Sequence, residues 1–162
     1  MIIDCHGHYT TEPKDLHRFR QEQTAAANAK NKALLPSRGS LKISDDEIRE
    51  SIEQNQLKLQ RDRGTDITIF SPRAAGMGHH IGDFKTSEEW TRASNEMIYR
   101  VTELFPENFI GVAQLPQTPG ADPKTIILNR MSVTSPRVLF IIFSYIPRSL
   151  VQKSRCNLPP NP

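Results

Sequence analysis

The sequence predicts an α/β fold whose parallel strands alternate with helices. Three short segments at residues 1–6, 66–71 and 109–114 are apolar or β-branched and have the length of buried strands. The chain between them carries helical patterns with capping signals. Strands joined through a helix lie parallel, with a right-handed crossover, in nearly all known cases. In such sheets the chemistry takes place on loops that leave the carboxyl ends of the strands.

The first two predicted elements are a strand and a helix with a narrow apolar face. The strand segment reads Met-Ile-Ile-Asp-Cys-His, and Gly7 is expected to end it. A helix is predicted over 13–29, followed by a polar loop at 28–40. One stripe of the helix carries Leu16, Phe19, Arg20 and Gln23.

The second helix has clear signals at both ends. Ser44 and Glu47 form a capping box, in which each side chain bonds to the backbone of the other residue. The helix is expected to run to Arg63, where Gly64 supplies a stop. Its apolar side chains are Ile48, Ile52, Leu57 and Leu59.

The strand at 66–71 ends at Pro72 and leads into a glycine-rich loop at 73–85. Residues 86–89 read Thr-Ser-Glu-Glu, which predicts a second capping box and a helix that stops at Pro106. The strand at 109–114 and a proline-rich loop then follow.

The last part of the chain has a different composition. All 18 acidic residues lie at or before Asp122, whereas residues 126–162 contain five basic residues, no acidic ones and several prolines. We therefore expect two regions: 1–125, which follows the strand–helix pattern, and 126–162, a basic proline-rich tail that is out of frame or disordered. The alternative is a genuine basic extension that binds an acidic partner.

Composition also excludes several classes of protein. Two cysteines make no disulfide framework, and the first residues lack the features of a signal peptide. The longest apolar run, at 138–146, is too short to span a bilayer. The basic residues of the tail are scattered, so we expect neither nucleic acid nor a membrane as partner, and a cytoplasmic location. Phosphate-binding glycine motifs, Ser-His-Asp order and Cys-x-x-Cys are absent.

His6 and His8 are the candidate metal ligands. Side chains two residues apart on a strand point to the same face, so both imidazoles can bind one divalent cation. Asp4 is in phase with them, whereas Cys5 is expected to point away into the core. The alternative is an ordinary pair of histidines near a chain end.

Two further candidates follow the second strand. Ser71 and Arg73 are the candidate substrate-binding residues. Both would lie at the same edge of the sheet as the histidines, where a guanidinium suits a substrate carboxylate. The alternative for Arg73 is a surface ion pair. His79 and His80 lie on the glycine-rich loop, and we expect His80 to act as a catalytic acid or hydrogen-bond donor, with an ordinary loop histidine as the alternative.

Four segments carry a resemblance to a known family. They are Met-Ile-Ile-Asp-Cys-His-Gly-His at the start, Gly-Thr-Asp-Ile-Thr-Ile-Phe-Ser-Pro-Arg at 64–73, Leu-Phe-Pro-Glu-Asn-Phe-Ile-Gly-Val-Ala-Gln-Leu-Pro-Gln at 104–117 and Asp-Pro-Lys-Thr at 122–125. The chain resembles the amidohydrolase-related, metal-dependent hydrolases, and within them the 4-oxalomesaconate hydratases. The likeness ends near residue 125, where the composition changes.

The resemblance implies that the chain is the N-terminal part of a (β/α)8 TIM barrel of the metal-dependent hydrolase type, incomplete in this chain. It implies one Zn²⁺, with His6 and His8 matching the first-strand ligands and Arg73 matching an anchor for a substrate carboxylate. Family members complete the metal site with a histidine and an acidic residue from later strands. We expect neither ligand in this chain.

The implied reaction is zinc-dependent addition of water to an unsaturated tricarboxylic acid in aromatic-acid catabolism, by an enzyme that is a homo-oligomer at full length. We expect this shorter chain to be inactive. The alternatives are a related metal-dependent decarboxylase or hydrolase acting on a carboxylated substrate, and a non-catalytic fragment.

Overall fold

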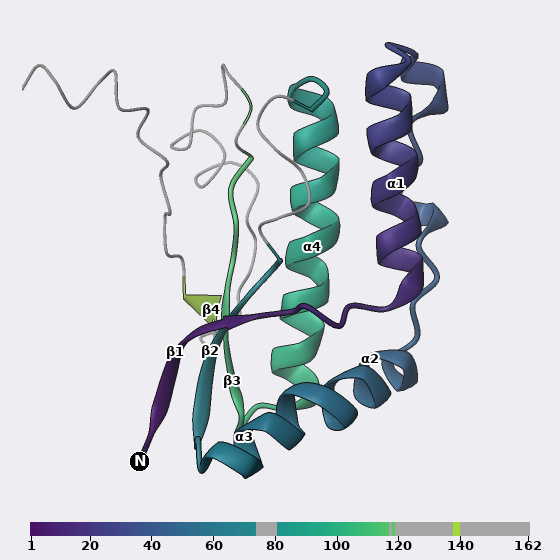
Figure 1. Cartoon of the computed structure of the whole chain (residues 1–162). Coiled ribbons are helices and arrows are strands. Elements are labelled where there is room, and N and C mark those ends of the chain that lie inside the picture. Colours follow the sequence, from purple (N-terminus) through teal and green to yellow (C-terminus); the bar gives the residue numbers. More distant parts are fainter. Residues whose placement is uncertain (74–80, 117, 119–137, 140–162) are drawn as a thin grey trace, which may run out of the picture.

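The computed structural model describes residues 1–73, 81–116, 118 and 138–139. Four parallel strands form one sheet in the order β1-β2-β3-β4 (Figure 1). The strands are β1 (Ile3–His8), β2 (Ile67–Ser71), β3 (Phe109–Val112) and the two-residue β4 (Val138–Leu139). The predicted α/β class and parallel sheet are therefore confirmed for the first three strands. No strand was predicted where β4 lies.

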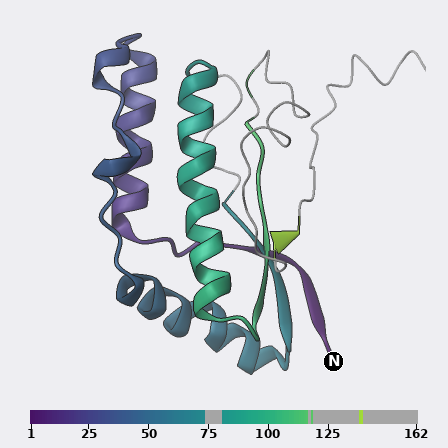
Figure 2. The same ribbon diagram turned by 180° about the vertical axis from the view of Figure 1, so that it is seen from behind.

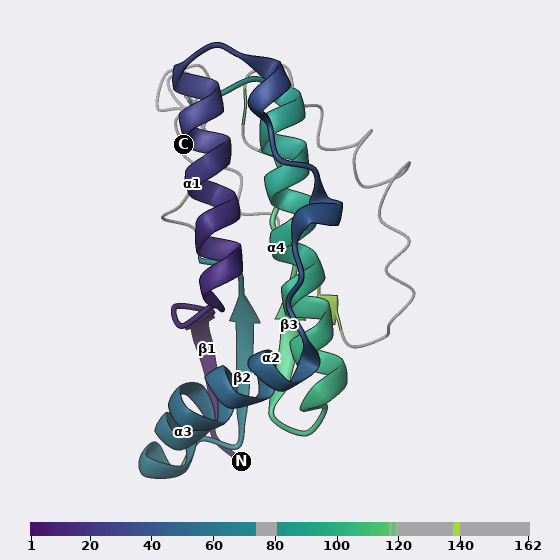
Figure 3. The same cartoon turned by 90° about the vertical axis from the view of Figure 1, so that its right-hand side faces the viewer.

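The helices lie on one side of this sheet, as Figures 1 and 2 show from opposite directions. They are α1 (Lys14–Asn28), α2 (Asp45–Ile52), α3 (Lys58–Arg63) and α4 (Phe84–Leu104). Two short 3-10 turns, Lys32–Leu34 and Arg38–Ser40, lie in the predicted polar loop. Figure 3 shows α1 and α4 side by side in front of the strands, with α2 and α3 crossing beneath them. In the described part of the chain, no helix has the length and apolar character needed to cross a membrane.

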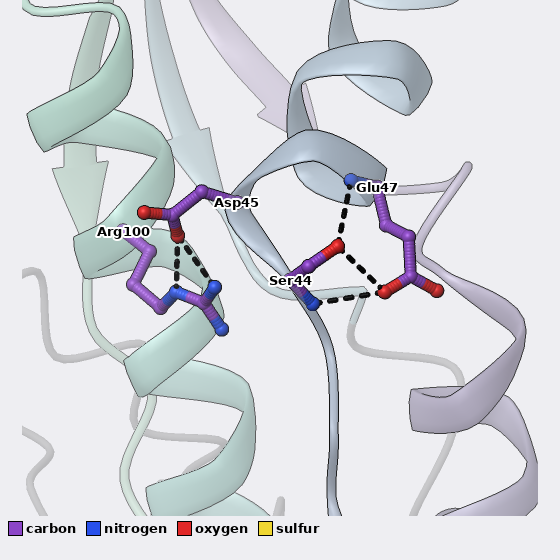
Figure 4. A network of polar contacts seen from close by, with 4 residues as sticks. All are labelled: Ser44, Asp45, Glu47 and Arg100. Atoms are coloured by element: carbon purple, nitrogen blue, oxygen red, sulfur yellow. Dashed lines mark hydrogen bonds and ion pairs between the residues drawn. The ribbon is translucent and has the colours of Figure 1, made fainter.

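The capping box at the start of α2 is confirmed. The Glu47 amide donates to Ser44 Oγ at 3.2 Å, and the Ser44 amide donates to Glu47 Oε2 at 2.8 Å (Figure 4). Beside it, Arg100 of α4 donates through Nε to Asp45 Oδ1 at 3.0 Å, which joins the two helices. At the far end, Gly64 has a φ of 67°, the left-handed conformation expected of a helix-ending glycine.

The single helix predicted between Ser44 and Gly64 contains a wide turn. Glu53–Leu57 is a π-helical segment between α2 and α3. Ile48 and Ile52 are buried four residues apart, but the next buried apolar residue, Leu57, comes five residues later. The wide turn absorbs this extra residue and keeps Leu57 inward. Leu59, predicted on the apolar face, is instead 47% exposed.

The predicted second capping box is wrong. Helix α4 begins at Phe84 with Asp83 as its N-cap, three residues before the predicted cap Thr86. The Thr86 amide donates to Asp83 Oδ1 at 3.0 Å, so Thr86 is a first-turn residue and not the cap. An aspartate carboxylate satisfies the free amides of a first turn at least as well as a threonine hydroxyl.

A row of aromatic rings forms the core between sheet and helices. Tyr9, Phe70 and Phe109 come from three adjacent strand segments, and the ring centroids of neighbouring pairs are 5.5 and 4.8 Å apart. All three are 1% exposed. Apolar residues of the helices pack on them: Phe19, Ile48, Ile52, Trp90, Ile98 and Val101.

The first strand departs from regular alternation. Asp4 pairs with Thr68 and Gly7 with Phe70, so β1 advances by three residues over the stretch in which β2 advances by two. This bulge places Asp4 in register with the helix-facing side of β2, and His8 in register with Ser71 on the other side. Asp4 is therefore not in phase with His8, which corrects the prediction. Cys5 lies in the bulge and is exposed rather than buried in the core.

Gly7 lies inside β1 and does not end it. A Cβ atom here would lie 2.2 Å from Thr68 Cγ2, 3.0 Å from the Ile69 carbonyl oxygen and 3.2 Å from Phe70 Cδ2. The two strands thus approach too closely for any other residue.

Replacing Gly7 by alanine is expected to lower the free energy of unfolding by about 1–3 kcal/mol or more, because the backbone of β1 or β2 has to move. Urea denaturation measures the change. Gly39→Ala is the matched control, since its Cβ would meet nothing closer than Ser37 Oγ at 3.8 Å. Equal stability of the two variants would contradict the close approach.

Candidate functional site

The imidazoles of His6 and His8 converge at the end of β1. Their Nε2 atoms are 3.1 Å apart, and the rings are perpendicular with centroids separated by 4.7 Å. Two nitrogens bound to one tetrahedral cation at about 2.0–2.1 Å would lie roughly 3.3 Å apart. The two nitrogens therefore already have the spacing of a chelating pair.

The backbone explains this convergence. The bulge between Asp4 and Gly7 changes the alternation of β1, and the lack of a side chain at Gly7 lets β1 lie against β2. His8 is the last residue of β1, and Ser71, its partner in register, is the last residue of β2. Both therefore lie at the carboxyl ends of parallel strands, where α/β proteins place their chemistry.

Two ligands do not make a complete metal site. In the described part of the chain, no cluster of three or more His, Cys, Asp or Glu residues could hold an ion. The Asp4 carboxylate accepts a hydrogen bond from the His6 amide at 3.0 Å, and Asp4 is in register with Thr68, whereas His8 is in register with Ser71. Since catalytic zinc sites use three protein ligands, this pair fits as part of a site that needs more.

Ser71 contacts the second histidine. Its Oγ lies 2.6 Å from His8 Nδ1 and 3.1 Å from the carbonyl oxygen of Gly7. The predicted contact of Ser71 with substrate stays a prediction, and in the structure its hydroxyl contacts the strand that carries the histidines.

Arg73 follows Ser71 and the buried Pro72, and it is exposed. It is thus at the same edge of the sheet as the two imidazoles. His79 and His80 lie outside the described residues, so the predicted catalytic role of His80 stays a prediction.

Glu12 and Arg20 form a charged pair near Arg73 that the sequence did not predict. The Glu12 side chain is 6% exposed, and its Oε1 lies 3.8 Å from Nη1 of Arg20, whose side chain is 12% exposed. The Arg20 guanidinium lies over the ring of Trp90, 5.0 Å from its centroid. The sequence offered only a weak signal, an arginine on the otherwise inward stripe of α1.

These charges act on one another. Burial raises the pKa of the Glu12 carboxyl, and the positive charges of Arg20 and Arg73 oppose that rise. Burial also lowers the pKa of Arg20, and the charge of Arg73 adds to this effect. Glu12 Oε1 is buried and has no hydrogen-bond partner among the described residues. Charged side chains of both signs therefore interact at the edge beyond β1 and β2.

A side chain of helix α4 holds the backbone just after β3. Asn95 of α4 donates to the carbonyl oxygen of Gln114 at 2.9 Å and accepts from the Gln114 amide at 2.9 Å. Strand β3 was predicted to reach Gln114 but ends at Val112. The Asn95 amide replaces a strand partner and holds the start of the next loop.

A cavity of about 150 Å³ borders the histidine pair, and its lining includes Asp4, His6, His8, Gln60 and Thr68. Small-molecule sites usually have about 300–1,000 Å³. The described residues thus form only part of the wall that a substrate site needs.

Comparisons with known proteins agree with this partial site. The family model described as Amidohydrolase matches residues 3–131. The chain is 54% identical over 122 residues to a 2-keto-4-carboxy-3-hexenedioate hydratase of Sphingobium sp. (strain NBRC 103272 / SYK-6), covering 75% of this chain and 35% of that protein.

The crystal structure of 4-oxalomesaconate hydratase LigJ from Rhodopseudomonas palustris is also similar, with a TM-score of 0.71 and 54% identity. That match covers 78% of this chain and 37% of the solved chain. The chain therefore spans about a third of the length of both relatives and holds an incomplete part of their barrel. The family model matches residues 3–131, which is most of this chain, and the chain therefore belongs to the amidohydrolase family.

Proposed function

We propose that this chain supplies the first metal ligands and a carboxylate-binding arginine of a hydratase of the 4-oxalomesaconate type. Both relatives named above are hydratases, at 54% identity. The single observation that carries the proposal is the 3.1 Å separation of His6 and His8 Nε2 at the carboxyl end of β1. The proposed substrate is an unsaturated tricarboxylic acid.

His6 and His8 would hold a zinc ion together with ligands from outside the described residues. When bound, the zinc supplies Lewis acidity that polarises an oxygen of the substrate or of water. The two neutral imidazoles leave most of the positive charge of the ion uncompensated, which suits an anionic substrate.

Arg73 would bind a substrate carboxylate through its planar fork of N–H groups. The buried pair behind it supports this role. Arg73 is exposed, and its positive charge acts on both Glu12 and Arg20. A substrate carboxylate placed beside Arg73 would therefore meet this positive charge. His80 is the proposed donor of the proton that water addition requires at the adjacent carbon.

Hydration is favoured over decarboxylation or hydrolysis by the two hydratase relatives, because a first-strand histidine pair alone does not separate these reactions. The alternative of a non-catalytic fragment with a partner-binding tail rests on residues 126–162, nearly all of which lie outside the described residues. That this tail does not belong to the barrel stays a prediction.

Zinc binding provides the first test. The chain is expected to bind zinc weakly, since its described residues offer two ligands where three are usual, and His6→Ala or His8→Ala should abolish that binding. Competition with a chromophoric chelator measures the affinity. His17→Ala is the matched control, because His17 is an exposed histidine of α1 that contacts Gln21. Unchanged affinity in the His6 variant would refute the assignment.

The hydratase role is tested in a chimera in which residues 1–125 replace the corresponding part of the Rhodopseudomonas palustris enzyme. We expect the chimera to hydrate 4-oxalomesaconate, followed as loss of conjugated absorbance, whereas the 162-residue chain alone shows no turnover. In the chimera, Arg73→Gln should lower kcat/KM by about 10- to 100-fold, as expected when a charged hydrogen bond is lost. Arg61→Gln, at an exposed arginine in the last turn of α3, is the control. A folded chimera that only decarboxylates or hydrolyses its substrates would overturn the proposal.

The charge state of Glu12 gives a prediction on stability. Its pKa is raised in the folded chain, so the resulting stabilisation is present below its unfolded pKa of about 4.3 and is lost as pH rises through the folded pKa. Glu12→Gln should therefore gain stability relative to the original chain between about pH 4 and pH 7. Urea denaturation at both values measures the difference. The opposite trend would mean that attraction to Arg20 outweighs burial of the carboxylate.

A further inference from the structure

We infer that Ser71 is a positioning residue that fixes His8 in the tautomer with its hydrogen on Nδ1, so that the lone pair of Nε2 points toward His6. The use of this lone pair for a metal rests on the proposed function. The tautomer itself follows from the hydrogen-bond geometry of the two strand ends.

The number of hydrogens available to Ser71 decides the tautomer of His8. Ser71 Oγ lies within hydrogen-bond distance of two atoms, the Gly7 carbonyl oxygen at 3.1 Å and His8 Nδ1 at 2.6 Å. A hydroxyl has one hydrogen, and a carbonyl oxygen can only accept. The hydroxyl therefore donates to Gly7, and the remaining contact needs a hydrogen from His8 Nδ1. If Ser71 instead donated to His8, two oxygen acceptors would face each other with no hydrogen between them.

The backbone holds Ser71 and His8 in the position that these two hydrogen bonds need. His8 and Ser71 are partners in register across the parallel pair β1 and β2. The Tyr9 amide donates to the Ser71 carbonyl oxygen at 2.9 Å, which continues the ladder past His8. The hydroxyl and the imidazole are thus brought together by strand pairing, and no long flexible side chain takes part.

The consequence reaches the first histidine. With the Nε2 of His8 unprotonated, the 3.1 Å contact between the two Nε2 atoms needs a hydrogen on His6. In the absence of a cation, His6 therefore donates through Nε2 to His8. A bound cation requires a lone pair on both nitrogens, so only His6 has to change tautomer. His8 therefore already has the tautomer that ligation needs, whereas His6 changes its tautomer when a cation binds.

Nuclear magnetic resonance of the imidazole nitrogens tests this in the metal-free, 162-residue chain, at a pH where both rings are neutral. We expect hydrogen on Nδ1 of His8 and on Nε2 of His6. Ser71→Ala should move His8 toward the other tautomer, while Ser71→Thr, which keeps a hydroxyl, should retain the original spectrum. Thr68→Val is the matched control, because the Thr68 hydroxyl accepts from Gln60 and faces the helices.

A zinc titration separates the two claims. Ser71→Ala should weaken zinc binding by about 10- to 100-fold, the usual cost of removing a hydrogen-bond partner of a ligand histidine. If Ser71→Ala shifts the His8 tautomer but neither the original chain nor any variant binds zinc, the positioning role of Ser71 holds and the proposed metal role fails. Hydrogen on Nε2 of His8 in the original chain overturns the inference, even if Ser71→Ala fails to fold. An unchanged His8 spectrum in a folded Ser71→Ala chain overturns it as well.

Discussion

The close approach of β1 and β2 at Gly7 is the constraint on which the rest of the structure depends. A side chain at this position would overlap Thr68 and the backbone of Ile69. Its absence allows a bulged strand to keep its hydrogen bonds and still bring His6 and His8 together. The same approach sets His8 opposite Ser71. One hydrogen atom in place of a methyl group therefore controls both strand pairing and the geometry of the histidine pair.

The two sides of the sheet have separate tasks. The row of Tyr9, Phe70 and Phe109 faces the helices and is almost fully buried. His8 and Ser71 are in register on the other side, at the ends of the same strands. Because neighbouring residues of a strand point in opposite directions, Phe70 can anchor the core while Ser71 contacts a candidate ligand. Stability and chemistry are thus encoded in alternate residues of the same five-residue strand.

Much of this arrangement could be predicted from the sequence, where the signal was local. Ser44 and Glu47 identify a helix start because the capping box uses only neighbouring residues. The pair at His6 and His8 could be recognised because strand periodicity places side chains two residues apart on the same face. The bulge at Asp4–Gly7 and the wide turn before Leu57 could not, since both depend on how distant segments pack. The contacts of Ser71 with His8 and of Glu12 with Arg20 were also beyond reach, because they join residues from different elements.

The Asn95 amide has a mechanical consequence. It ties the backbone of Gln114, at the exit of β3, to the middle of α4 through two hydrogen bonds of equal length. A strand exit is normally steered by its neighbours in the sheet, but here a helix side chain steers it. A small rotation of α4 about its axis would therefore be transmitted directly to the segment that leaves β3.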